Sequence, residues 1–123
     1  MPSILLNSHM DVVPVYPDSW KYPAFSAHLA EDGQIYARGA QDMKNVGMQY
    51  LEAVRNLKAS GSHLKRTIHI CFVPEEEKGG RQGVQKFVQT GDFRALNIGL
   101  SLDEGAANAG DEFLVFNGER SIW

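Results

Sequence analysis

The chain has 123 residues, of which 43% are hydrophobic, and its 12 Lys and Arg against 15 Asp and Glu give a formal net charge of −3. This length suits one domain, and the near-balanced charge excludes the basic surface of a nucleic-acid-binding or polybasic membrane-binding protein. No apolar run approaches membrane-spanning length, no basic segment opens the chain, and Cys71 is the only cysteine. We therefore expect a soluble, cytoplasmic protein with neither nucleic-acid nor membrane partners.

Residues 3–8 contain the short apolar run ILL, which predicts a strand that is covered on both faces, as in a parallel sheet. A buried strand this close to Met1 would place the start of the chain inside the core, so we expect further sequence upstream. His9 and Asp11 follow it, and in extended backbone their side chains point to the same side. A neutral imidazole can bind a metal through one nitrogen while a carboxylate fixes its tautomer through the other. The alternative is a histidine in a surface loop.

Residues 25–29 and 34–38 flank an Asp-Gly pair and predict a β-hairpin. The hairpin leads to Asp42, after which apolar and small residues recur at helical spacing from Met43 until Gly61. We expect a helix over residues 43–61. Asp42 is placed either to cap the start of this helix or to act as a metal ligand, and the sequence leaves both roles open.

A second buried strand is expected over residues 67–73, where it ends at a proline that is followed by Glu75, Glu76 and Glu77. Because a helix connects it to the first strand, the two strands should be parallel. Three adjacent carboxylates repel one another, so they need either cations nearby or solvent around them. The segment is therefore either part of a metal site or a solvated acidic turn.

The remaining chain predicts a second helix that opens at Gly79-Gly80 and ends near residues 90–91, and a strand over residues 98–102 that ends in Asp103 and Glu104. One more strand is expected over residues 112–116. Strands that alternate with helices indicate an α/β fold, a three-layer αβα arrangement with a mostly parallel central sheet.

In open α/β sheets, ligands bind outside the carboxyl ends of the strands. The expected topology brings one imidazole and several carboxylates to this edge, from His9, Asp11, Asp42, Glu76, Glu77, Asp103 and Glu104. Mixed imidazole and carboxylate ligands suit zinc, manganese or cobalt, and two ions would need a carboxylate to bridge them. Hydrolysis at such a centre also needs a proton acceptor, and a carboxylate beside a ligand carboxylate is well placed to be one.

Four segments, in order and nearly end to end, resemble the co-catalytic zinc metallopeptidase family, which includes aminoacylases, carboxypeptidase G and succinyl-diaminopimelate desuccinylase. They are HMDVVP at 9–14, YARGAQDMK at 36–44, EEEKGG at 75–80 and LDEG at 102–105. Within the family, AQDMK, YLEAVR at 50–55 and ERS at 119–121 most resemble the eukaryotic aminoacylases. The resemblance implies hydrolysis of N-acyl-L-amino acids to a carboxylate and a free L-amino acid.

The resemblance also implies roles for individual residues in a site with two zinc ions. His9 and Glu104 would bind the first ion, Glu77 would bind the second, and Asp42 would bridge the two. Glu76 would be the proton acceptor for the bridging water.

Asp11 would orient His9. The family's last histidine ligand, its lid and dimerisation domain and its upstream strands have no match here. Residues 1–123 are therefore expected to be a central part of a catalytic domain, incomplete at both ends and inactive alone, and the full-length protein is expected to be a homodimer. Two alternatives stay open: a dipeptidase or other N-acyl amidohydrolase of the same family, and a non-catalytic truncated isoform or metal-binding module.

Overall fold

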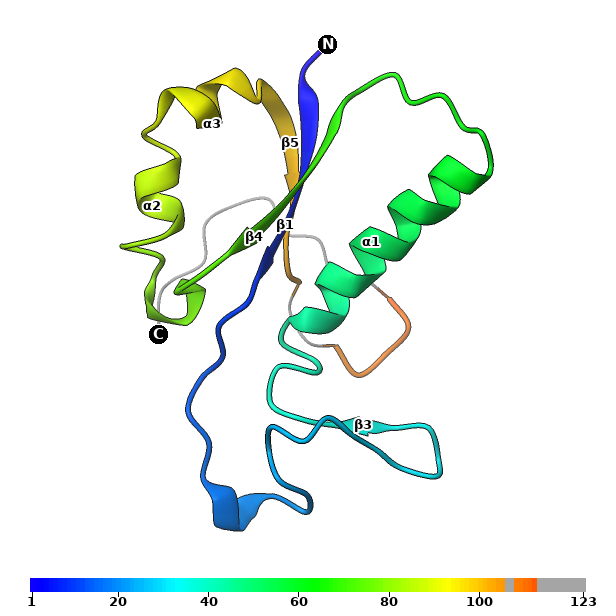
Figure 1. Cartoon of the computed structure of the whole chain (residues 1–123), viewed down its shortest axis with the longest axis vertical. Helices are drawn as coiled ribbons and strands as arrows, with labels where there is room; N and C mark the ends of the chain where they lie inside the picture. The colour runs from blue at the N-terminus through cyan, green and yellow to red at the C-terminus, as the bar shows by residue number, and fades with distance from the viewer. Residues whose placement is uncertain (106–107, 113–123) are drawn as a thin grey trace.

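A three-stranded parallel sheet forms the centre of the computed structural model, which describes residues 1–105 and 108–112 (Figure 1). Its strands are β1 (Ser3–His9), β4 (Ile68–Val73) and β5 (Ile98–Leu102), in the order β4-β1-β5. The parallel sheet expected from the short apolar runs is confirmed, with the first strand in the middle.

Strand β1 is the most enclosed element, because it has a neighbour on each side and helices beyond both faces. Apart from Ile4, each of its residues is buried. It pairs in parallel as far as His9 opposite Val73 on β4 and Leu6 opposite Leu102 on β5. All three strands consequently run toward the same edge of the sheet.

Helices lie on both sides of the sheet, which gives the expected α/β fold in three layers (Figure 1). Helix α1 (Lys44–Ala59) packs on one side, and α2 (Val84–Phe87) and α3 (Gly91–Ala95) lie on the other. Gly47 allows α1 to approach the sheet closely, since a Cβ there would lie 2.8 Å from the ring of Phe72.

The expected hairpin is present but short, with β2 (His28–Leu29) antiparallel to β3 (Ile35–Tyr36). Gly33 takes a φ of 82° in the turn, a conformation that glycine adopts readily. Ala27 has a φ of 48°, which interrupts the extended backbone before β2 and explains why the strand begins later than predicted.

The prediction of one continuous second helix was wrong. A 3-10 turn, η2 (Glu76–Lys78), is followed by left-handed backbone at Gly79 and Gly80, so α2 begins only at Val84. A separate helix, α3, then starts where the hydroxyl of Thr90 accepts a hydrogen bond from the backbone N–H of Phe93.

Residues 113–116 of the strand expected over residues 112–116, and the ERS segment at 119–121, lie outside the described residues. Within the described part of the chain, no helix combines the length and apolarity needed to cross a membrane.

Candidate metal centre

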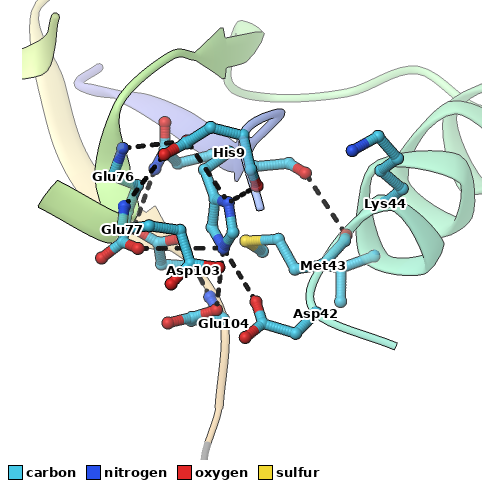
Figure 2. Close-up of polar contacts among 12 residues, drawn as sticks. His9, Asp42, Met43, Lys44, Glu76, Glu77, Asp103 and Glu104 are labelled. Carbon is cyan, nitrogen blue, oxygen red and sulfur yellow. Dashed lines mark hydrogen bonds and ion pairs between the residues drawn. The ribbon is translucent and has the colours of Figure 1, made fainter. Parts of the chain in front are cut away.

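The imidazole of His9 is the centre of a cluster of carboxylates at the carboxyl edge of the sheet (Figure 2). His9 ends β1 and is only 2% exposed. Its Nε2 lies 2.8 Å from Asp42 Oδ1, 3.4 Å from Glu104 Oε2 and 3.8 Å from Glu76 Oε2. The three carboxylates come from the loop before α1, the segment after β5 and the turn η2, so the cluster depends on the whole sheet.

A backbone contact holds the His9 ring in this orientation. The second ring nitrogen, Nδ1, lies 2.9 Å from the backbone carbonyl oxygen of Asp11, whereas the nearest carboxylate oxygen of Asp11 is 3.6 Å away. That carboxylate instead accepts hydrogen bonds from the backbone N–H groups of Glu76 and Glu77, at 2.9 and 3.1 Å. We expected the Asp11 carboxylate to orient His9. The carbonyl of Asp11 makes the shorter contact, and the carboxylate of Asp11 links the end of β1 to η2.

Asp42 does not cap α1. The residue at the N-cap position is Met43, which is 1% exposed and makes no capping hydrogen bond. The carboxylate of Asp42 points to His9 instead (Figure 2). Lys44 links the start of α1 to the segment after β1, because its Nζ donates a hydrogen bond of 2.6 Å to the Met10 carbonyl.

Glu77 lies apart from the His9 cluster. Its Oε1 accepts a hydrogen bond of 3.2 Å from the backbone N–H of Val13. Glu77 and Asp42 both line a cavity of about 200 Å³ that also contacts Trp20 and Arg38. Asp42 therefore faces His9 on one side and shares this cavity with Glu77 on the other.

The cluster carries an excess of negative charge. Burial acts to lower the pKa of His9, but the Asp11 carbonyl and the carboxylates of Asp42 and Glu104 outweigh burial and raise that pKa. Burial, with repulsion from the neighbouring carboxylates, raises the pKa of Glu76 and of Glu104. A cation at this position would relieve the repulsion.

The donor set fits a divalent metal ion. His9, Asp42 and Glu104 each offer a ligand atom, and these three atoms lie within 4.8 Å of one another. One imidazole nitrogen with carboxylate oxygens is a combination that suits zinc and chemically similar ions.

Asn7 was not singled out by the sequence analysis, although it lies beside the cluster. Its side-chain amide donates a hydrogen bond to the carboxylate of Asp103. The available signal was an amide side chain within an otherwise apolar, buried strand, because such a group needs a polar partner.

A family model described as peptidase family M20/M25/M40 matches residues 5–120. The chain belongs to this family of metal-dependent enzymes. The family resemblance that the motifs suggested is thus confirmed.

Within this family, the chain is a homologue of aminoacylase-1. It is 58% identical to aminoacylase-1 of Homo sapiens over 123 residues and 56% identical to aminoacylase-1 of Dictyostelium discoideum over 124 residues. Each alignment covers 100% of the chain and 30% of the relative, so the chain spans under a third of the length of these proteins. It is also 37% identical over 107 residues to the N-fatty-acyl-amino acid synthase/hydrolase PM20D1 of Xenopus tropicalis. That alignment covers 87% of the chain and 20% of the relative.

Solved structures show the same fold. An M20 family metallo-carboxypeptidase, Sso-CP2 from Sulfolobus solfataricus, matches with a TM-score of 0.74 and 32% identity, over 85% of this chain and 23% of that one. Human carnosine dipeptidase 1 matches with a TM-score of 0.66 and 23% identity, over 83% of this chain and 22% of that one. The second likeness concerns the fold alone.

Proposed function

We propose that the protein containing this chain hydrolyses N-acyl-L-amino acids to a carboxylate and a free L-amino acid at a two-zinc site. The observation that carries the proposal is the meeting of His9, Asp42 and Glu104 at the carboxyl edge of the sheet, with ligand atoms within 4.8 Å of one another. The 58% identity to human aminoacylase-1 supports the choice of substrate class.

The ligand assignment comes from the family resemblance, and the meeting of His9, Asp42 and Glu104 supports it. His9 and Glu104 would hold one ion, and Glu77 would hold the other across the small cavity. Asp42 would be shared, since it contacts His9 and also lines that cavity with Glu77. Zinc bound here would polarise the substrate carbonyl and make a water more acidic.

Glu76 is the proposed proton acceptor. Its Oε2 lies 3.8 Å from Nε2 of His9, beside the proposed ligands, and a positioned glutamate carboxylate can act as a general base. Glu76 takes a proton from the water whose oxygen forms a bond to the acyl carbon. It then gives that proton to the amide nitrogen as the carbon–nitrogen bond breaks, which releases the amine of the amino acid.

Asp11 has a supporting role in this proposal. Its carbonyl holds Nδ1 of His9, which leaves Nε2 directed at the carboxylates. Its own carboxylate accepts hydrogen bonds from the N–H groups of Glu76 and Glu77. The pKa of Asp11 is lowered because these N–H groups outweigh burial, which would raise it. Asp11 thus positions both the proposed ligand and the proposed base.

The larger protein is also part of the proposal. Residues 1–123 would be one portion of a catalytic domain whose further histidine ligand and lid and dimerisation domain lie elsewhere in the protein. The chain alone would be inactive, and the whole protein would act as a homodimer in the cytoplasm. Cys71, the one cysteine among the 123 residues, is a free thiol, which is compatible with that reducing compartment.

The proposal is tested with the natural full-length protein, loaded with zinc and assayed on N-acetyl-L-methionine and on an unblocked dipeptide. We expect release of methionine from the acylated substrate with the higher kcat/KM. Preference for the dipeptide would support the dipeptidase alternative. No turnover of either substrate by zinc-loaded, folded protein would support a non-catalytic module.

A further inference from the structure

The two consecutive acidic residues after β5 point in different directions. Glu104 is directed to His9, whereas Asp103 is engaged with β1 (Figure 2). The Asn7 amide nitrogen donates a hydrogen bond of 2.9 Å to Asp103 Oδ2. The other oxygen, Oδ1, accepts a hydrogen bond of 2.9 Å from the backbone N–H of Glu104. The Asp103 carboxylate therefore connects Asn7 to the backbone of a proposed metal ligand.

The sheet register explains this contact. β1 and β5 pair in parallel with Leu6 opposite Leu102, so the next position brings Asp103 beside Asn7. Asn7 is only 9% exposed, and an amide buried in an apolar sheet needs a hydrogen-bond partner. A negatively charged acceptor makes this hydrogen bond stronger than one between neutral groups.

The contact fixes the distance between two strand ends. His9 lies two residues after Asn7 on β1, and Glu104 lies one residue after Asp103. A weak contact of 3.4 Å from the Tyr50 hydroxyl to the Asp103 carbonyl adds a link to α1. The backbone of Glu104 is thereby held to the same strand that carries the histidine.

We propose that Asn7 and Asp103 are positioning residues, which hold Glu104 at the distance from His9 that metal binding requires. The inference rests on the proposed function, because it takes His9 and Glu104 as ligands of one ion. It predicts that the Asn7–Asp103 hydrogen bond contributes to metal affinity. A purely structural contact would contribute to folding stability only.

A reciprocal exchange of the two residues tests the hydrogen bond directly. In Asn7→Asp, two carboxylates face each other and repel. In Asp103→Asn, the amide oxygen takes the place of only one of the two carboxylate oxygens, so either Asn7 or the N–H of Glu104 faces the new NH2 group and loses its acceptor. In the double variant, the amide at position 103 donates to the carboxylate at position 7, and its oxygen still accepts from Glu104. Asn56→Asp on the exposed surface of α1 is the control for the added charge.

The measurements are zinc affinity by chelator competition, the visible absorption of the Co²⁺-loaded natural full-length protein, and thermal unfolding. We expect each single variant to bind one metal equivalent roughly 10–100-fold more weakly, as is typical when a residue supporting a ligand is changed. The double variant should recover at least half of the lost zinc affinity, measured on a logarithmic scale. It should also show the Co²⁺ spectrum of the wild type. Asn56→Asp should match the wild type.

Unchanged affinity in both single variants would overturn the inference, and so would a double variant that binds no better than the singles. If Asn7→Asp fails to fold, the comparison of Asp103→Asn with the double variant decides. A wild-type protein that binds no zinc would contradict the proposed function itself, so the two failures are distinguishable.

Discussion

At the scale of single residues, the two ring nitrogens of His9 have different partners. A backbone carbonyl holds Nδ1, and carboxylates from three other segments surround Nε2. The sequence predicts that the acidic residues meet this histidine, because parallel strands end at one edge of a sheet. The carbonyl contact from Asp11 has no sequence signal, since every residue carries a carbonyl. The sequence also carries no signal for the direction of the Glu77 side chain, because that direction depends on the turn η2.

Glu76→Gln separates proton transfer from metal binding. The amide keeps the size of the side chain but is no base, so we expect kcat to fall by roughly 10²–10⁴-fold in the natural full-length protein. Zinc content should stay the same, because Glu76 is not among the proposed ligands. Glu75→Gln removes the same charge one residue away and should leave kcat near the wild-type value. Full turnover in Glu76→Gln would exclude Glu76 as the proton acceptor.

At the scale of elements, local patterns predicted most of the structure. The sequence predicted β1, β4 and β5 because strands that are buried on both faces appear as short apolar runs. It predicted α1 because apolar residues recur there at helical spacing. The second helix was mispredicted because Gly79, Gly80 and Thr90 interrupt that segment. Gly79 and Gly80 adopt left-handed backbone, and the Thr90 hydroxyl caps a new helix. These effects act over one or two residues, which periodicity does not resolve.

Gly83→Ala tests how the loop after β4 is held. A Cβ at Gly83 would lie 2.6 Å from the backbone carbonyl oxygen of Pro74, so the backbone itself must shift. We expect a loss of about 1–3 kcal/mol in the free energy of unfolding, measured by urea titration of the natural full-length protein. Gly91→Ala is the matched control, since a Cβ there meets no atom within 4 Å. Equal free energies of unfolding for the two variants would contradict this expectation, because they would show that the loop backbone shifts at little cost.

At the scale of the whole molecule, the described residues bury little apolar surface. The buried hydrophobic side chains among residues 1–105 and 108–112 are Leu5, Leu6, Ala24, Met43 and Val73. Large side chains stay exposed on the hairpin and α1, including Phe25, Ile35 and Met48, which are 70%, 60% and 58% exposed. All three are among the residues that line an apolar cavity of about 870 Å³. Large apolar side chains that are exposed together mark either a surface that another part of a protein covers or an aggregation liability.

We propose that residues 1–123 belong to a longer protein, so the 123-residue chain should behave differently from that full-length protein when it is produced alone. We expect it to bind the dye ANS and to unfold over a broad range of denaturant, because its core is small and its apolar faces are open. The natural full-length protein should bind little dye and unfold cooperatively. Sharp unfolding of the isolated chain without dye binding would show that its core suffices.

The most direct test of the proposed centre is a crystal structure of the zinc-loaded full-length protein with an anomalous difference map at the zinc edge. The account predicts a peak at roughly 2.0–2.2 Å from Nε2 of His9 and from carboxylate oxygens of Asp42 and Glu104. It predicts a second peak between Asp42 and Glu77. Zinc bound elsewhere, or no anomalous peak beside His9, would contradict the account.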